Sequence, residues 1–561
     1  MQNAMLRPPA QAMDLNRLGA GFASRLSFMR SLVRHMMDDQ WRIEYSRFNL
    51  DESGYGHVVF DIQSPNSHLS FVVFSQYLNP DERNDRVIAE KWDLTMTLME
   101  GGVDDATLAM LADNVPLQEA GRIDARSISL ARANRSARVF GEVLECLRNG
   151  QQPDVKRLTE VGYLYRTTAV YGSGKFGSCD WDKVVNQHPD LAQPFAGEML
   201  VCYLLRQFSL DQLHHMVHQD AYPNAVDMDK GLQRYLGIGN STGLGMAPWL
   251  INHPQVIAQW ILQRETALAN VLATQVSGEK ITQLQELMAR ACQHVREVST
   301  FDQWQAEKNR VLLSDLEALN DWFADVATEV ASWQQINTWA EQHYSLETQE
   351  LLVSLLLELF PELVDGLEGQ MGTVESLQYD PTASAQDLAD AIQESYDWVF
   401  DYDFTDPKQE QTFWYYSQGK IEPRLGKVGI DEGAELQMFL GIAKAVQDCH
   451  TDVLAMLADN GQATIADILL AKPHHQAIVA RIATMSQTHY GEIRANLLDA
   501  DVLPMHLLRG KLAFFGVSKF DPKSALWVRN TMFQGAPLVS DLATDINEDW
   551  SFPVAPSMVA Q

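Results

Sequence analysis

Cysteine is scarce in this chain, and its distribution argues against a disulfide framework. The 561 residues contain five cysteines, an odd number, and they lie far apart in the sequence. Secreted proteins that depend on disulfides usually carry an even and clustered set. No C-x-x-C spacing occurs either, so the common cysteine motifs for redox chemistry and zinc are missing. We therefore expect a reducing, cytoplasmic environment, in which the cysteines are small buried side chains.

The sequence also lacks any long apolar run. No stretch approaches the roughly 18 uncharged apolar residues that indicate a membrane span. The first apolar stretch, residues 15–36, follows the period of a helix and is interrupted by Arg17, Arg25 and Arg30. A secretory signal would need a continuous apolar core instead. We therefore expect a soluble protein with no membrane partner.

Positive charge is in short supply. Lys and Arg number 43 against 74 Asp and Glu, which gives a formal net charge of −31 at pH 7. Proteins that bind nucleic acids gain most of their affinity from Lys and Arg placed against phosphates. An anionic bilayer repels so acidic a protein for the same reason. The charge balance therefore argues against nucleic acid and against a membrane surface as main partners.

The shortage of positive charge is greatest between Arg310 and Lys408, where neither Lys nor Arg occurs. Twenty-one Asp and Glu fall in residues 311–407, about two thirds of the net charge. They are interleaved with Leu, Trp and Phe, which predicts helices with an apolar face and not a disordered tail. We favour the interpretation that these acids form a solvated surface. The alternative is a docking surface for a basic partner.

What the chain does contain is a clear change of hydrophobic period. Residues 40–100 alternate with a period of two, and the turn sequences Asp51–Gly54 and Ser64–Ser67 separate the runs, which predicts a four-stranded antiparallel meander. Residues 69–74 are apolar on both faces, as in a central strand. The expected fold class is mainly α with an N-terminal antiparallel β-meander (α+β), with a multi-helical body. The length indicates two or three cores.

Helical periodicity follows the meander, with Asp104 as the N-cap of the first helix. The predicted helices cover residues 126–149, 154–168, 192–219, 255–277 and 280–298, and continue through 306–364 and 434–500. A strand is predicted over residues 525–533. We divide the chain into four stretches: 1–102 with the first helix and the sheet, 103–305 as a helical domain with Gly-rich loops, 306–407 as an acidic helical module, and 408–561 as a helical and mixed domain.

Three segments combine glycine with groups that can bind or react. The first, residues 171–177, contains Tyr171, Gly174 and Lys175 among three glycines. Glycine lets a backbone approach a ligand closely, and a lysine held there can pair with an anion or act as a nucleophile. The segment is not a Walker A loop, because Ala169 occupies the first glycine position and Phe176 follows the lysine. A plain flexible turn remains the alternative.

The second segment, residues 237–254, is the strongest candidate for a site. Four glycines with Asn240, Ser241, Thr242 and His253 precede a helix predicted to start near Pro254. Exposed N–H groups of a first helical turn attract anions. The glycine spacing differs from the Rossmann pattern, and no strand clearly precedes it. We expect a ligand-binding loop in which residues 240–243 supply hydrogen bonds and His253 transfers a proton.

The third segment, residues 514–522, resembles the first. Both read aromatic, Gly, any residue, small residue, Lys and Phe, so Lys519 falls on the position of Lys175. Chance is one explanation of this similarity. The other is that two similar lysine loops converge on one pocket.

An arginine-rich stretch is unusual in so acidic a chain. Arg132 and Arg135 would be neighbours on one face of the predicted helix, and a guanidinium fork suits a carboxylate or a phosphate. Pairing with an acidic surface of another domain is the alternative. Five arginines lie within seventeen residues that hold one acid: Arg122, Arg126, Arg132, Arg135 and Arg138.

The histidines give a weaker signal. His214 and His218 are four apart on a predicted helix, a spacing that can hold a metal. The H-E-x-x-H arrangement is absent and no further ligand is evident, so we favour an ordinary helix face and predict no metal site. No G-x-S-x-G element supports a serine hydrolase.

These features favour an enzyme that acts on a small anionic metabolite bearing a carboxylate or a phosphate, with no cofactor motif evident. In this hypothesis Lys175 and Lys519 bind or activate the substrate, and Arg135 or Arg138 holds its anionic group. The rival is a non-catalytic scaffold or regulator whose acidic module docks a basic partner. A ligand sensor without turnover would use the same pocket. A homo-oligomer is compatible with all three.

Overall fold

The computed structural model divides into two units, each described by itself. The sheet unit comprises residues 21–243, 270–368 and 509–561, and the helical unit comprises residues 1–20, 244–269 and 369–508. The four sequence stretches proposed above stay predictions. The structure describes residues 6–79, 81, 91–117, 124–167, 187–243, 254–298, 300–326, 332–371, 377–406, 414–417, 420–425, 437–439, 442–492, 509–524, 527–544 and 550–557.

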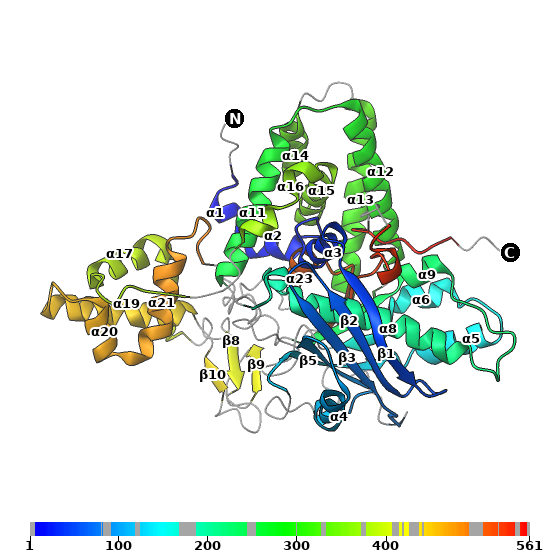
Figure 1. Ribbon diagram of the computed structural model, residues 1–561. Helices are drawn as coiled ribbons and strands as arrows, with labels where there is room; N and C mark the ends of the chain where they lie inside the picture. Colours follow the sequence, from blue (N-terminus) through cyan, green and yellow to red (C-terminus); the bar gives the residue numbers. More distant parts are fainter. Residues whose placement is uncertain are drawn as a thin grey trace. The chain divides into compact units, whose positions relative to one another are not determined.

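A nine-stranded mixed sheet forms the centre of the sheet unit (Figure 1). Its spatial order is β1-β2-β3-β4-β5-β6-β7-β12-β11, and among these strands β6 and β7 form the parallel pair. The strands are β1 (Arg42–Leu50), β2 (Gly56–Gln63), β3 (His68–Ser75), β4 (Leu94–Glu100), β5 (Ser127–Arg135), β6 (Tyr163–Thr167), β7 (Gly237–Gly243), β11 (Lys519–Ser524) and β12 (Trp527–Met532).

The predicted meander is confirmed as β1 to β4. Consecutive strands pair in antiparallel register, with Val59 opposite Val72 and Val73 opposite Met96. Residues 51–54 and 64–67 make the predicted turns between them. β3 is buried on both faces, as expected of a central strand. The fold class, α+β with a helical body, is confirmed.

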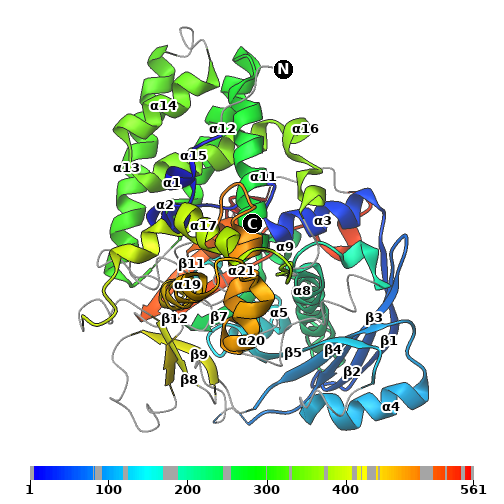
Figure 2. The same cartoon turned by 90° about the vertical axis from the view of Figure 1, so that its left-hand side faces the viewer.

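Helices cover both faces of this part of the sheet. On one face α4 (Asp105–Asn114) packs Leu108 and Leu111 against Val59 and Val72 (Figure 2). Asp104 caps α4 by accepting a hydrogen bond from the Thr107 amide, as predicted. The opposite face holds α8 (Ala196–Val217), a helix buried over most of its surface. α8 contacts β5, β6 and β7, so it spans the junction between the meander and the later strands.

Three of the predicted helical stretches contain strands; in the last of them, 434–500, residues 437–439 form β10. Residues 126–149 form β5 followed by α5 (Phe140–Arg148), and residues 154–168 form α6 (Val155–Val161) followed by β6. α6 ends at Gly162, whose φ of +84° closes the helix in the left-handed conformation. Sheet pairing with distant strands overrides the local helical pattern in these first two stretches. The helix predicted over residues 15–36 is likewise two helices, α2 (Leu15–Ala20) and α3 (Phe28–Asp38).

The acidic stretch begins in the sheet unit as a group of packed helices. α15 (Leu346–Leu359) contacts α12 (Gly278–Glu297), α13 (Gln303–Val326) and α14 (Trp333–His343). Leu351, Leu352, Leu355 and Leu356 of α15 are all completely buried. The apolar residues between the acids therefore form a core, as the sequence predicted.

In the helical unit, α17 (Ala385–Ser395), α19 (Ile442–Asp459), α20 (Ile465–Ala471) and α21 (Gln476–Met485) share one apolar core. Thr464 and Asp467 form a reciprocal capping box at the start of α20. Other elements of the chain are α1 (Pro9–Ala12), α9 (Lys230–Tyr235), α11 (Pro254–Leu272), α16 (Pro361–Val364), and the three-stranded sheet of β8 (Trp414–Ser417), β9 (Lys420–Leu425) and β10 (Gln437–Phe439). Throughout the described ranges, no helix is both long and apolar enough to cross a bilayer.

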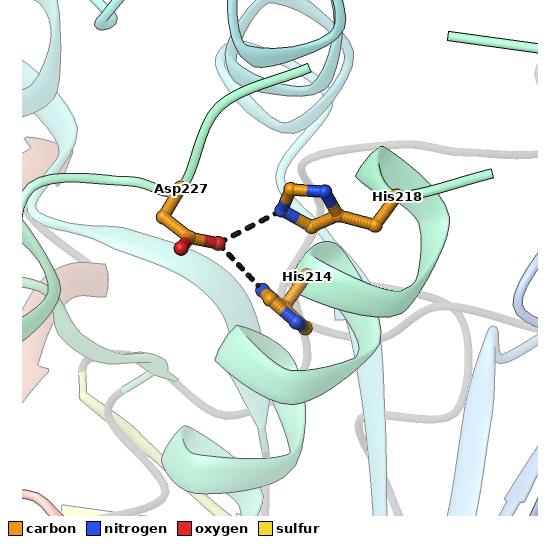
Figure 3. Close-up of side chains that lie close together, drawn as sticks. All are labelled: His214, His218 and Asp227. Carbon is orange, nitrogen blue, oxygen red and sulfur yellow. Dashed lines mark hydrogen bonds and ion pairs between the residues drawn. The ribbon is translucent and has the colours of Figure 1, made fainter. Parts of the chain in front are cut away.

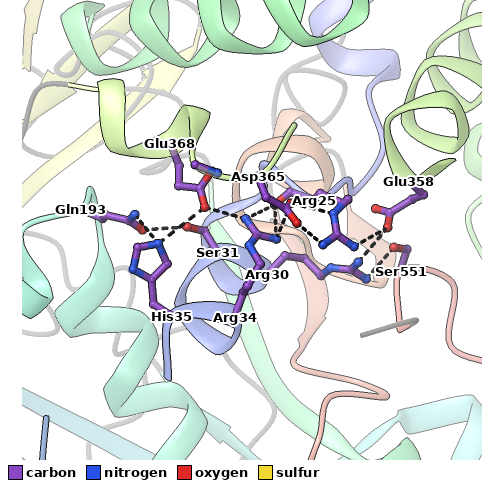
Figure 4. A network of polar contacts seen from close by, with 11 residues as sticks. Arg25, Arg30, Ser31, Arg34, His35, Gln193, Glu358, Asp365, Glu368 and Ser551 are labelled. Atoms are coloured by element: carbon purple, nitrogen blue, oxygen red, sulfur yellow. Dashed lines mark hydrogen bonds and ion pairs between the residues drawn. The ribbon is translucent and has the colours of Figure 1, made fainter. Parts of the chain in front are cut away.

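A buried network of charges joins α3 to part of the acidic stretch (Figure 4). Arg34 donates to Glu368 at 2.6 Å and Arg30 donates to Glu358 at 2.8 Å. The pKa of Glu368 is about 2: burial raises it, but the hydrogen bond from His35 and the ion pair with Arg34 outweigh burial. These carboxylates therefore pair within the chain. Further contacts of this charge network join Arg25 and Arg34 to Asp365, Arg25 to Glu358, Arg30 to Ser551, Ser31 to Gln193, and Gln193 to His35.

Candidate functional site

The second glycine-rich segment is a strand where a loop was expected. Residues Gly237–Gly243 form β7, which pairs with β6 on one side and β12 on the other. A Cβ on Gly239 would lie 2.6 Å from the Tyr163 ring, and one on Gly237 would lie 2.2 Å from the Met532 carbonyl oxygen. These two glycines are therefore explained by close packing inside the sheet. The helix predicted after this segment does begin at Pro254, as α11.

The register of β6, β7, β12 and β11 builds a charged face. Arg166 stands opposite Gly239, which stands opposite Thr531, and Thr531 stands opposite Lys519. Residues paired across neighbouring strands share a face of the sheet. The next row along places Ser241, Arg529 and Asp521 opposite one another. We call Arg166, Lys519, Asp521 and Arg529 the charged sheet face. All four side chains are at least nine-tenths buried.

Lys519 is the one predicted catalytic residue that the structure describes. Its Nζ donates to the carbonyl oxygens of Thr159 and Glu160, at 3.0 and 2.7 Å, in the last turn of α6. Burial lowers the pKa of this lysine to about 8; Asp521 opposes the shift, and the nearby charge of Arg138 adds to it. An amine with a pKa near neutrality can exchange a proton under physiological conditions.

The positive charge of Arg138 acts on Lys519 and helps to lower the pKa of its amine. The Arg138 guanidinium donates to the Tyr163 hydroxyl at 3.3 Å. The Tyr163 ring covers Gly239, which stands in the same cross-strand row as Lys519, so Tyr163 lies over the charged sheet face. Residues far apart in sequence meet here because β6, β7, β12 and β11 are neighbours in the sheet.

Arg135 and Asn240 have other surroundings. The Arg135 guanidinium donates to the Tyr165 hydroxyl at 2.6 Å and lies 4.7 Å over the Phe140 ring. The Asn240 amide donates to the Thr167 carbonyl at 3.0 Å. Arg132, three residues before Arg135, lies 4.1 Å over the Trp92 ring. The expected helix face shared by Arg132 and Arg135 is wrong, because β5 is a strand and side chains three apart point to opposite faces.

The third segment is a helix end and a strand start in place of the expected loop. α23 (Gly510–Phe515) ends at Gly516, whose φ is +83°, and β11 begins at Lys519. A Cβ on Gly516 would lie 2.8 Å from the Ser27 side chain. This glycine is therefore required by the helix end and by close packing.

Several predicted site residues lie outside the described residues or are described by their backbone alone. Tyr171, Gly174, Lys175 and His253 lie outside the described residues. Ser241, Thr242 and Gly243 are placed by their backbone in β7. Because β6 and β7 are parallel neighbours, Thr167 and Gly243 end their strands at the same edge of the sheet. The sequence reasoning missed Arg166, Asp521 and Arg529, since nothing local marks them as neighbours.

A second cluster of polar groups lies at the carboxyl end of α8 (Figure 3). His214 Nδ1 and His218 Nε2 both contact Asp227 Oδ1, at 3.0 and 2.8 Å. The pKa of Asp227 is lowered, chiefly by the hydrogen bond from His218. The spacing of the histidines was visible in the sequence, but Asp227 was missed because it lies beyond the helix. We call these three residues the histidine–aspartate cluster.

Comparisons with known proteins add no relatives to this description. No protein-family model, no curated protein and no solved structure matches the chain. The chemistry of the two clusters is therefore argued from their own geometry.

Proposed function

We propose that the protein is an enzyme that acts on a small anionic metabolite held at the charged sheet face. The observation that carries this proposal is Lys519, which is buried on this face, where burial lowers its pKa to about 8. Buried lysines of lowered pKa serve as proton acceptors or nucleophiles, and such groups concentrate at functional sites. The substrate class is a carboxylate or a phosphate ester, because the face carries more cationic than anionic side chains.

In this proposal, some N–H donors of the Lys519 amine hold the main chain and one binds the ligand. An ammonium group has three N–H donors. Two of them hold the carbonyls of Thr159 and Glu160 and so fix the amine at the end of α6. We assign the third to the ligand. Arg138 supplies a second donor group to the same anion, and Lys175 and His253 stay candidates for the reaction itself.

A ligand screen tests the proposal. Purified protein is incubated with a panel of carboxylates and phosphate monoesters, and the melting temperature is recorded for each compound. A ligand should raise the melting temperature of the wild type, and Lys519→Gln and Arg138→Ala should abolish that rise. Arg296→Ala is the matched control, because Arg296 is exposed and pairs with Glu317 at the surface. Product formation from the same ligand separates an enzyme from a sensor.

The outcomes that contradict the proposal are equally specific. If no anion in the panel raises the melting temperature, the charged sheet face has no ligand of this class. If a ligand binds with equal affinity to wild type and to both variants, it binds elsewhere. Circular dichroism on each variant shows whether the sheet unit is still folded, so a loss of binding can be separated from a loss of structure.

A further inference from the structure

The histidine–aspartate cluster presents the ligand types that divalent transition metals prefer. Two imidazole nitrogens and one carboxylate oxygen are the ligand set of many zinc sites that keep an open position. The candidate ligand atoms of His214, His218 and Asp227 all lie within 4.8 Å of one another. A tetrahedral zinc ion with bonds of about 2.0–2.1 Å separates its ligand atoms by about 3.3 Å. The observed spacings of 2.8 and 3.0 Å to Asp227 are slightly shorter, so small side-chain movements suffice.

The ring nitrogens that would bind a metal ion already point at the Asp227 carboxylate. His214 points its Nδ1 and His218 its Nε2 at the same oxygen of Asp227 (Figure 3). A metal ion would take the place of the two hydrogens shared in these contacts, on the same nitrogens. The i, i+4 spacing sets both rings on one side of α8, with their centroids 4.5 Å apart. No change of backbone is required.

The electrostatic surroundings favour a cation. His214 lies in the last turn of the 22-residue helix α8 and His218 is its C-cap, at the carboxyl end that carries a partial negative charge. A second carboxylate, Asp211, lies one turn earlier on the same side and borders the same pocket. It accepts hydrogen bonds from Tyr45 and Gln207.

A comparable group in the helical unit lacks these properties. Asp452, His474 and His475 also bring their candidate ligand atoms within 4.8 Å of one another. There, however, the Lys472 ammonium lies 3.1 Å from the Asp452 carboxylate. A fixed positive charge at that distance repels a metal ion, so we assign no ion to this group.

We propose that the protein binds a zinc-class divalent ion through His214 Nδ1, His218 Nε2 and Asp227 Oδ1. The site leaves one tetrahedral position for water or a substrate atom, because the chain supplies three ligands. That position faces a pocket of about 240 Å³ lined by the three ligands and by Asp211. Asp211 then accepts a hydrogen bond from the water on the ion. This site is separate from the charged sheet face and does not depend on the function proposed there.

Metal titration of the full chain tests the inference. Protein freed of metal by a chelator is titrated with ZnCl₂ in a calorimeter, and with CoCl₂ while visible absorption is recorded. We expect one tight equivalent and a Co²⁺ spectrum typical of tetrahedral nitrogen and oxygen ligands. His214→Ala, His218→Ala and Asp227→Asn should each weaken binding by about 100-fold or more, and Asp211→Asn by about tenfold.

His215→Ala is the matched control, because His215 is on the same helical turn and its ring contacts the Asp51 carbonyl instead. This variant should bind Zn²⁺ with the affinity of the wild type. The inference is overturned if the wild type binds no Zn²⁺, or if His218→Ala and Asp227→Asn bind it unchanged. An equal loss in His215→Ala also overturns it. Because the three ligand side chains are exposed, each variant should fold without metal. Its metal-free melting temperature checks this.

Discussion

The charge network around α3 and the histidine–aspartate cluster use similar groups in opposite ways. In the charge network, Arg34 and Glu368 are 5% and 1% exposed, and each has a charged partner. In the cluster, His214 and Asp227 are 63% and 68% exposed, and a single carboxylate oxygen serves two histidines. A buried pair is fixed, because removing either partner leaves an unpaired charge. An exposed cluster can exchange its contacts for a ligand at little cost. The buried charge network is therefore suited to stabilising the fold, and the exposed cluster is suited to binding a ligand.

The largest expected effect comes from breaking the charge network. Arg34→Ala removes the arginine partner of the buried Glu368 carboxylate, which keeps His35 and the Gly366 amide. We expect the free energy of unfolding to fall by about 3–5 kcal/mol. Denaturant titration followed by circular dichroism measures the change. The double variant with Arg34→Met and Glu368→Leu should recover much of the loss, and a fall below about 1 kcal/mol in Arg34→Ala would contradict a structural role.

Acid should weaken the same network. The pKa of Glu368 is about 2 in the folded protein, below the ordinary value near 4.3 in an unfolded chain. Its contribution to stability is therefore complete above about pH 5 and is lost as the pH falls toward 2, by on the order of 3 kcal/mol. Glu368→Gln should lack this part of the pH dependence. Identical pH profiles for the two proteins would show that the carboxylate is not held by its partners.

A smaller effect is expected at the histidine–aspartate cluster, where a ligand adds stability. Zn²⁺ at about 100 times its dissociation constant should raise the free energy of unfolding by about 2.7 kcal/mol. His218→Ala should show no such rise, while its metal-free melting temperature equals that of the wild type. A strongly destabilised metal-free variant would instead place this cluster with the structural charge network.

The smallest effect is expected at an exposed pair. Arg42 and Glu44 form an ion pair on β1 with both side chains largely in solvent. Water and salt screen such pairs, so Arg42→Ala should leave the melting temperature unchanged within error. A clear loss of stability there would mean that exposure does not separate the two kinds of cluster.

Sequence reasoning predicted the elements whose signals are local. The meander was predicted because alternating strands are joined by short turns, and α4 because Asp104 caps it. β5 and β6 were assigned to helices because each adjoins a genuine helix in the sequence, and β7 was assigned to a loop because it consists mostly of glycine and small polar residues. β7 in particular reads as a loop, since Gly237 and Gly239 are explained by close contacts with Met532 and Tyr163, which lie far away in the sequence.

The candidate sites show the same limit. Lys519 was found by its resemblance to Lys175, but its partners are main-chain carbonyls of α6, which leave no signature in a sequence. The pair His214 and His218 was visible through its spacing. Asp227 was not, because its position depends on how the chain turns back after α8. At both sites, contacts between segments far apart in the sequence determine which side chains come together.

The position of β12 in the sheet has a consequence for synthesis of the protein on the ribosome. β7 ends at Gly243 and its outer neighbour β12 begins at Trp527, with 283 residues between them. At typical elongation rates this interval takes about 15 to 60 s. During that time β7 presents unpaired amide and carbonyl groups, the kind of edge at which chains aggregate. Nascent chains that stop before the β11–β12 hairpin should therefore need a chaperone or an early degradation signal more than full-length chains do.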